Sequence, residues 1–548
     1  MAEGGQSRAR IVALGILVSR LVGLVREKAI AWFFGVGPHA DVYRLAFRAP
    51  NALQNLLGEQ TLSASFIPVY SRLLAEGRRE DAGRFAGAVF GLLLVAVSAL
   101  VLLGMAFAPQ LVAVLTPGLA ADAAKVAAGE MTIDRMPLVI RAVRIVFPMT
   151  GLLVLSAWAL GILNSHRRFL LPYAAPVVWN AAILTALFLA ADSAGIRLPR
   201  SASLADLERW LMAAFWGALV GGFLQFSVQL PAVLRVTHGL KFGFSLETVG
   251  VREALRTLGP ALAGRGVVQI SLYVDQVLGS FLKAGAPGAL GWAGLVGNLP
   301  LSVFGMSVAA AELPELSRAG GAERGEMAQR IERGLGQIAF VIAPAVVGYL
   351  GFGFLVAGLI FKGGQFTTED NWLVYAVLLG YTFGLLASSF SRLLQNAFFA
   401  LRDTKTPARI AAVRLVASAL VGGGLMFVFD RYSVSEVLGL ADGKNLHFGA
   451  VGLSLSAGLA SWWEFWRLRA ALRRSLPELR VPAARIARRF ALAAAAALPA
   501  FALWWWLPTA NVVWQALAVL PVYAAGYLAA AWFGRLPELD LWLGRLRR

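Results

Sequence analysis

The sequence predicts an all-α polytopic integral membrane protein with about fourteen transmembrane helices. Only 15% of its 548 residues are charged, 58% are hydrophobic and the mean hydropathy is +0.68, whereas about 25% of residues are charged in a soluble protein. Apolar runs of about 20 residues, the length that crosses the hydrocarbon core, recur along the whole chain. These runs are continuous rather than alternating, which excludes a closed β-barrel.

The predicted spans follow one another so closely that no large soluble domain fits between them. The first covers 10–35 and is not a cleaved signal peptide, because Arg20 and Arg26 interrupt its apolar core. The remaining spans are expected at 40–74, 84–116, 137–164, 170–193, 207–236, 250–283, 287–317, 330–361, 371–401, 407–430, 447–474, 485–507 and 511–534.

Lysine and arginine gather in the loops that lie on the same side as the N-terminus, above all at 72–84, 318–333 and 467–489. Cytoplasmic loops carry such an excess, so both termini are expected in the cytoplasm. Basic residues at the headgroup level also account for the net charge of +19, which favours membrane lipids over nucleic acid as partners.

Composition and motifs argue against cofactor chemistry. The chain has no cysteine, its four histidines lack metal-ligand spacing, and it contains no Walker A sequence. No nucleophile and base pair stands out. We therefore expect no metal, no catalytic residue and no ATP, and the sequence leaves open whether membrane potential or an ion drives the protein.

Two short patterns recur and indicate an internal repeat. Pro-x-x-Ser-Arg occurs at 68–72 and 314–318, and a basic helix end followed by a proline occurs at 164–172 and 402–407. Each half then holds six spans, an even number, so the halves are parallel repeats, as in transporters that rock around a central site. The expected parts are a six-helix half at 1–240, a second at 241–480, and two additional helices with a basic tail at 481–548.

Charged residues inside the first two spans are the main functional signal. A charge at membrane depth costs at least about 2.5 kcal/mol, so it usually faces the bundle interior or a water-filled cavity. At 100° per residue, the polar residues of the first span fall within an arc of about 120°. They are Ser19, Arg20, Gly23, Arg26 and Glu27.

The second span carries a longer polar stripe. Its members recur three or four positions apart and share an arc of about 80° over about 27 Å of helix. They are Asp41, Arg44, Arg48, Asn51, Asn55 and Glu59. A stripe of this length must face other helices or water, and Pro50 is expected to bend it.

Basic side chains outnumber acidic ones in these two segments, which favours an anionic ligand. The guanidinium fork of arginine suits phosphate best, and from the second half Arg265 is the strongest candidate for the same cavity. The alternative is a set of buried ion pairs that only fixes helix packing, such as Arg20 or Arg26 with Glu59 or Asp41.

The N-terminal residues resemble the MurJ (MviN) family of bacterial lipid II flippases. The run 19–27, Pro50-Asn51, Gly58-Glu59 and Phe66-Ile67-Pro68-Val69 carry the likeness, and Asp403-Thr404-Lys405-Thr406-Pro407 extends it to the second half. The resemblance implies a non-enzymatic transporter of the MOP superfamily in the bacterial cytoplasmic membrane. Its substrate would be undecaprenyl-diphosphate carrying a disaccharide peptide, moved to the outer leaflet by alternating access without ATP.

The resemblance also implies roles for single residues. Arg20 and Arg26 would bind the diphosphate, and Asp41 and Glu59 would be functional acidic residues. We add Arg265 and Arg48 as further substrate-binding residues, and Glu27 to Asp41 and Glu59 as gating or charge-pair residues. Expected partners are the polyprenyl-diphosphate-linked glycan, membrane lipids, and proteins of cell-wall synthesis or division.

The chain departs from the family pattern at Gln54, Asn55 and Leu295, where family members can carry arginine. Either Arg265 and Arg48 supply this charge, or the ligand differs from lipid II. The alternative functions are a flippase for another polyprenyl-diphosphate-linked glycan and an ion-coupled exporter of small cations, which the positive stripe disfavours. A membrane scaffold or enzyme would leave the stripe unexplained.

Overall fold

The computed structural model describes residues 2–193, 199–301, 324–440, 443–507, 511–536 and 538–539, and of residues 2–14, 60, 200, 259–272 and 324 it describes the backbone alone. The second Pro-x-x-Ser-Arg pattern, at 314–318, lies outside the described residues. The chain divides into two compact units, unit 1 at Met1–Phe281 and unit 2 at Leu282–Arg548.

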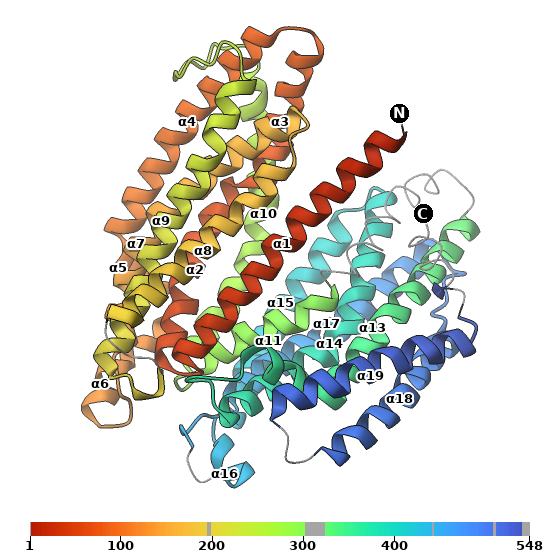
Figure 1. Cartoon of the computed structure of the whole chain (residues 1–548). Helices are drawn as coiled ribbons and strands as arrows, with labels where there is room; N and C mark the ends of the chain where they lie inside the picture. Colours follow the sequence, from red (N-terminus) through yellow and green to blue (C-terminus); the bar gives the residue numbers. More distant parts are fainter. Residues whose placement is uncertain are drawn as a thin grey trace. The chain divides into compact units, whose positions relative to one another are not determined.

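The predicted all-α fold is confirmed. The secondary structure of the described ranges is helical, apart from two isolated β-bridges (Figure 1). In this part of the chain, nine helices are long and apolar enough to cross a membrane. Each predicted span overlaps at least one described helix, whereas the count of fourteen crossings and the boundaries of the two repeats stay predictions.

Unit 1 is built mainly from long helices, of which α7, the most buried candidate span, packs against α2, α4 and α9. The elements are α1 (Ala2–Phe34), α2 (Pro38–Leu57), α3 (Glu59–Ala75), α4 (Arg79–Ala106), α5 (Ala108–Leu115), η1 (Pro117–Ala121), α6 (Asp122–Ala127), α7 (Arg135–Ser165), α8 (Leu170–Ser193), η2 (Pro199–Ser201), α9 (Leu204–Val236) and α10 (Val251–Ser280).

The expectation of one continuous helix over 40–74 is wrong, because the chain breaks at Gly58 between α2 and α3. The backbone of Gly58 is extended, with φ −80° and ψ −153°. A Cβ atom at this position would collide with the carbonyl oxygen of Gln54. Pro50, in contrast, lies within α2, which continues to Leu57.

The core of unit 1 is aromatic where α3, α4 and α7 meet. Phe66 stacks on Phe85 with ring centroids 5.2 Å apart. Trp158 is fully buried, and its Nε1 donates a hydrogen bond to the carbonyl oxygen of Ala86 at 3.1 Å. Because this bond satisfies the indole N–H, Trp158 is buried without an unpaired polar atom.

The segment between α9 and α10 lies along a row of glycines on α4. Gly83, Gly87 and Gly91 are spaced four residues apart and so share one face of that helix. A Cβ atom at these three positions would collide with the carbonyl groups of His238, Lys241 and Gly243, respectively. Only hydrogen side chains leave room for this backbone, so the glycine row fixes the path of the 238–243 segment.

Unit 2 is a second bundle, in which α14 packs against α13 and α17, and α17 packs against α15. Its described helices are α11 (Ala286–Pro300), α13 (Arg324–Phe361), α14 (Thr368–Ala400), α15 (Lys405–Phe429), α16 (Val434–Leu438), α17 (Gly449–Ser475), α18 (Ala483–Trp506) and α19 (Val512–Phe533).

In unit 2, tyrosine hydroxyls donate hydrogen bonds to backbone carbonyls that prolines leave without a donor. A proline inside a helix has no N–H, so the carbonyl four residues earlier loses its donor. For Pro344 in α13 that carbonyl belongs to Phe340, and it accepts from the hydroxyl of Tyr527 at 2.7 Å. For Pro300 in α11 it belongs to Val296, which accepts from the hydroxyl of Tyr349 at 2.7 Å.

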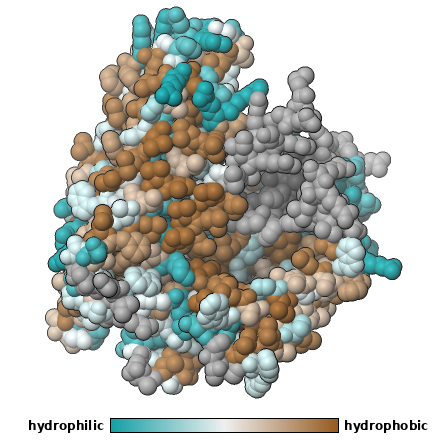
Figure 2. Space-filling view, in the orientation of Figure 1, coloured by the Kyte–Doolittle hydropathy of each residue, from teal (hydrophilic) through white to brown (hydrophobic). Residues whose placement is uncertain are grey.

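Helices α18 and α19, the two additional helices of the sequence analysis, pack against α13. Trp504 contacts Phe352, whereas Trp505 and Trp506 are 88% and 82% exposed, as expected for an interfacial aromatic belt. In unit 1, Figure 2 shows hydrophobic side chains over the middle of the visible face and hydrophilic ones at the end where α3 and α4 meet.

Candidate functional site

The described charged side chains near the predicted stripes of unit 1 form three groups. The first is a buried ion-pair triad of Asp41, Asp122 and Arg135, all 0% exposed. Nε and Nη2 of Arg135 donate to the two carboxylate oxygens of Asp122 at 2.6 and 3.0 Å, and Nη1 donates to Oδ2 of Asp41 at 2.9 Å. Asp41 lies in the first turn of α2, Asp122 begins α6 and Arg135 begins α7, so the triad ties the connection between α5 and α7 to α2.

The sequence pattern suggests an arginine of the first span as the ion-pair partner of Asp41, and it gives no indication that Arg135 is a partner. Arg135 lies just outside the predicted span 137–164 and is 94 residues from Asp41, so helical spacing cannot relate the two. One local signal was present. Asp134 is an N-cap residue whose carboxylate accepts from the backbone N of Met136 at 3.0 Å, which places the start of α7 at Arg135.

The second group joins α1 to α2 through Glu27, which is 3% exposed. Its Oε1 accepts from Nη2 of Arg26 at 2.6 Å, and its Oε2 accepts from Nη2 of Arg44 at 2.5 Å. The guanidinium of Arg26 also lies 4.8 Å from the ring centroid of Trp179 in α8, a cation–π distance. Its Nε is buried and has no hydrogen-bond partner among the described residues.

The third group lines a pocket of about 280 Å³ that contains Arg20 and Glu59. Helix α1 contributes Ile16, Ser19 and Arg20, spaced so that they share one face. Further polar lining comes from Gln54, Ser156, Tyr173 and Gln225, and the apolar lining is Leu153, Ala157, Leu160, Pro172 and Pro176.

The polar wall of this pocket is held in place by hydrogen bonds between α7 and α9. Oγ of Ser156 accepts from Nε2 of Gln229 at 2.6 Å and from Nε2 of Gln225 at 3.2 Å. The opposite side follows from the break at Gly58, which ends α2 shortly after Gln54 and starts α3 at Glu59. A carboxylate in the first turn of a helix is favoured by the helix dipole.

Arg20 and Glu59 therefore meet at one pocket, although Glu59 does not continue the stripe of α2 as expected. Within the described part of the chain, neither side chain forms an ion pair, and both are exposed. An arginine that lines a polar pocket and keeps its donors can bind an anionic group directly.

The remaining predicted residues lie elsewhere or outside the description. Arg48 follows Arg44 by one turn on α2 and is half-buried, and its carbonyl oxygen accepts from the hydroxyl of Tyr273 at 3.4 Å. The side chain of Arg265 lies outside the described residues. The structure thus gathers Arg20 with Glu59, and Arg26 with Glu27 and Arg44, while Asp41 belongs to the triad.

The face of α8 relates the two arginine groups to each other. Tyr173 and Pro176 line the pocket with Arg20, and Trp179, three residues further on, lies beneath Arg26. Arg20 and Arg26 are about 9 Å apart along α1 at 1.5 Å per residue. Two cationic groups therefore lie one after the other along the packed pair of α1 and α8.

Known proteins similar to this chain are membrane transporters. A family model described as lipid II flippase MurJ matches residues 30–524. The chain is 31% identical over 423 residues to a probable lipid II flippase MurJ of Bdellovibrio bacteriovorus, with 76% of each chain covered.

Solved structures with the same fold come from two kinds of transporter. A lipid II flippase MurJ in an inward closed conformation matches with a TM-score of 0.69 and 22% identity, over 98% of this chain and 99% of the other. An inward-facing multidrug resistance MATE family transporter of the MOP superfamily matches with a TM-score of 0.60 and 14% identity, over 83% of this chain and 96% of the other. At such identities the likeness shows the fold alone.

Proposed function

The chain belongs to the MurJ family of lipid II flippases, and from this premise we propose that it moves lipid II from the inner to the outer leaflet of the bacterial cytoplasmic membrane. We propose further that Arg20 and Arg26 bind the diphosphate of this lipid. The resemblance of the chain to the MurJ family is confirmed, since the family match covers residues 30–524.

The observation that carries the site assignment is the position of Arg20 at the pocket, where it forms no ion pair with any side chain that the structure describes. Its neighbours Ser19, Gln54 and Tyr173 are neutral hydrogen-bonding groups, and its only charged companion in the lining is Glu59. A diphosphate carries several acceptor oxygens, and arginine meets them with two parallel donors. Arg26, whose side chain is partly exposed, supplies a second cation further along the same helix.

The acidic residues act as exchange partners for these arginines. In this structure Glu27 accepts a hydrogen bond from Arg26. When a phosphate binds Arg26, it takes the place of the Glu27 carboxylate as the anion in contact with this arginine. Glu59 lines the same pocket as Arg20 and is the carboxylate that can pair with it in another conformation of the transporter. Asp41 instead anchors a loop in this conformation, through Arg135.

Other parts of the proposal rest on the sequence. Arg48 and Arg265 remain further candidates for the diphosphate, and both termini are proposed to be cytoplasmic because basic loops favour that side. Transport by alternating access would proceed without ATP, since the chain contains no Walker A sequence. Proteins of cell-wall synthesis or division are the proposed partners.

The test is genetic and biochemical replacement of a lipid II flippase. Wild-type chain should restore growth and outer-leaflet lipid II in a bacterium depleted of its own flippase. Arg20→Ala and Arg26→Ala should each reduce outer-leaflet lipid II strongly, because each removes a phosphate contact. Arg141→Ala, an exposed arginine on α7, is the matched control and should behave as wild type. Normal delivery by the Arg20→Ala, Arg26→Ala double variant would contradict the site.

A second candidate is a flippase for another polyprenyl-diphosphate-linked glycan. It is favoured by Gln54, a neutral side chain in the pocket lining where family members can carry arginine. The same replacement experiment separates the two functions. A correctly inserted wild-type chain that fails to restore lipid II delivery would favour the other glycan.

A further inference from the structure

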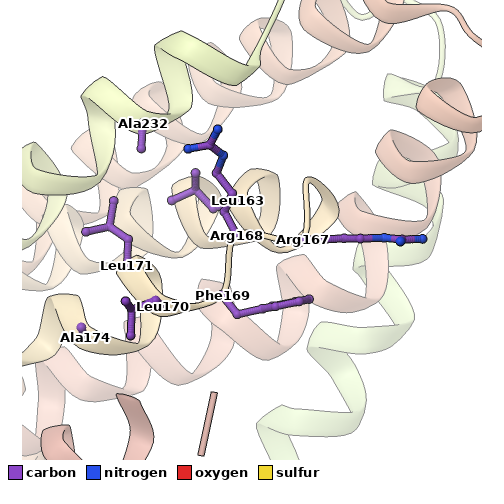
Figure 3. Close-up of a pocket in the computed structure, with 8 residues that line it drawn as sticks. All are labelled: Leu163, Arg167, Arg168, Phe169, Leu170, Leu171, Ala174 and Ala232. Carbon is purple, nitrogen blue, oxygen red and sulfur yellow. The ribbon is translucent and has the colours of Figure 1, made fainter. Parts of the chain in front are cut away.

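Unit 1 contains a second, larger groove that the proposed function does not use. It has a volume of about 490 Å³ and lies where α7 ends and α8 begins, with Ala232 of α9 on its wall (Figure 3). In Figure 3 Arg168 extends beside Leu163 and toward Ala232, whereas Arg167 projects to the other side of the loop. Apart from the two arginines, the groove is lined by apolar side chains. They are Leu163, Phe169, Leu170, Leu171, Ala174 and Ala232.

The groove lies at the arginine-rich end of unit 1. The hydroxyl of Tyr70 near the end of α3 is 3.0 Å from Nε2 of His166, which caps α7, so these helices end at the same level. Membrane-spanning helices begin and end at the lipid headgroups, and the basic side is expected to face the cytoplasm. A ligand in this groove would thus be at headgroup depth.

Some arginines at this end of unit 1 form ion pairs. Arg72 pairs with Glu253 at 2.6 Å, Arg78 pairs with Asp81 at 3.0 Å, and Arg84 pairs with Glu80 at 3.2 Å. Arg167 and Arg168 are exposed, and neither forms an ion pair within the described residues. The guanidinium of Arg168, which lies along the groove, is therefore available to an external anion, whereas Arg167 projects away from the groove (Figure 3).

The backbone of Arg167 forms the turn that carries Arg168. Its φ is 59°, in the left-handed region, and the loop closes with hydrogen bonds from Arg167 N to Asn164 O at 2.9 Å and from Arg168 N to Leu163 O at 2.8 Å. This is the helix-ending motif in which glycine is usual, because glycine adopts the conformation without strain. The motif ends α7 and so fixes the position of Arg168 at the edge of the groove.

The rest of the lining selects the kind of anion. Apart from the two arginines, the residues that line the groove are apolar, so they offer no hydroxyl, amide or carboxylate for a sugar or a peptide. The pocket of Arg20 has the opposite character, with Ser19, Gln54 and Glu59 in its wall. The larger groove therefore suits a phosphate joined to hydrocarbon and not a glycan head.

We propose that this groove is a binding site for an anionic glycerophospholipid of the membrane. The lipid phosphate is bound by Arg168, and one acyl chain lies against Leu163, Leu171, Ala174 and Ala232. Charge complementarity fixes the headgroup, since basic pockets between helices at the cytoplasmic face bind anionic lipids. The site is separate from the pocket of Arg20, and it does not depend on which glycan lipid that pocket carries.

The test measures lipid binding to the purified full-length protein in a neutral detergent. Short-chain phosphatidylglycerol, short-chain phosphatidylcholine and inorganic phosphate are each titrated, with the thermal unfolding midpoint and native mass spectrometry as readouts. Phosphatidylglycerol should bind the wild type at least about tenfold more tightly than the other two, and Arg168→Gln should weaken it by at least about tenfold, as expected for a lost charge-assisted contact.

Two glycine substitutions provide a matched pair. Arg167→Gly removes the neighbouring cation, whose side chain projects away from the groove in Figure 3, and relieves the backbone strain, so it should fold normally and bind phosphatidylglycerol like the wild type. Arg402 ends α14 with the same motif and a φ of 59°, so Arg402→Gly makes the same change in unit 2 and should also leave binding unchanged. The proposal is overturned if Arg168→Gln binds phosphatidylglycerol like the wild type, if either glycine variant weakens binding as much as Arg168→Gln, or if inorganic phosphate competes equally with the lipid.

Discussion

Asp41 and Glu59, two carboxylates expected to share one gating role, lie in opposite surroundings. Asp41 is fully buried and accepts a hydrogen bond from Arg135 at 2.9 Å. Glu59 is exposed on the wall of a pocket and has no ion-pair partner in the described part of the chain. The break at Gly58 separates the two helices that carry them. The comparison teaches that burial, more than position in a helical pattern, decides whether a carboxylate is free to change partner.

The energetic reason is the cost of an unpaired charge in the protein interior. Removing one member of a buried ion pair leaves the other without its counter-charge, and this destabilises far more than the pair itself stabilises. Glu59 avoids this cost because its side chain is exposed at the pocket. Three substitutions test this ordering, beginning with the largest expected loss of stability.

Arg135→Ala should lower the free energy of unfolding by about 3–5 kcal/mol, because it leaves two buried carboxylates without a cation. Thermal unfolding in detergent micelles measures the loss. Arg141→Ala, an exposed arginine on the same helix, is the control and should change stability by less than about 0.5 kcal/mol. Equal stability of the two variants would contradict a structural role for the triad.

Glu27→Gln should lower the free energy of unfolding by about 2 kcal/mol, the loss expected for charged hydrogen bonds at a partly buried site. The effect is smaller than for Arg135 because Arg26 and Arg44 are 16% and 19% exposed and can be hydrated. The same thermal measurement applies. A loss as large as that of Arg135→Ala would show that the Glu27 group is no more accessible than the triad.

Glu59→Gln should change the free energy of unfolding by less than about 0.5 kcal/mol, because the carboxylate is exposed and unpaired. Outer-leaflet delivery of lipid II should nevertheless fall, since Arg20 then lacks its exchange partner. The two readouts together sharpen the comparison. A variant that is strongly destabilised, or one that transports normally, would remove Glu59 from the proposed gating role.

Much of the fold could be predicted because lipid imposes a simple requirement on sequence. Continuous apolar runs indicated the helices, and charges within those runs indicated the pocket of Arg20 and the group around Glu27. The break at Gly58 was missed because a single glycine in an apolar helix is usually tolerated, and only its collision with Gln54 makes the exception visible.

Contacts between distant helices could not be predicted. The partner of Asp41 comes from a helix that starts 94 residues later, and the hydroxyl of Tyr527 reaches the carbonyl of Phe340 across 187 residues. In the second case a proline signals that a carbonyl lacks its donor, but not which side chain will supply one. Such pairings depend on packing, which a single sequence does not encode in any local pattern.

The glycine row of α4 has a consequence for how the protein is made. Residues 238–243 can dock only on a helix that is already in place, and Gly83, Gly87 and Gly91 leave the ribosome well before them. Domains generally fold as units during synthesis, the N-terminal one first. Unit 1, which ends at Phe281, can thus close around its own linker while unit 2 is still being translated. A bulkier residue in the row would prevent this docking and leave the linker without its place on α4.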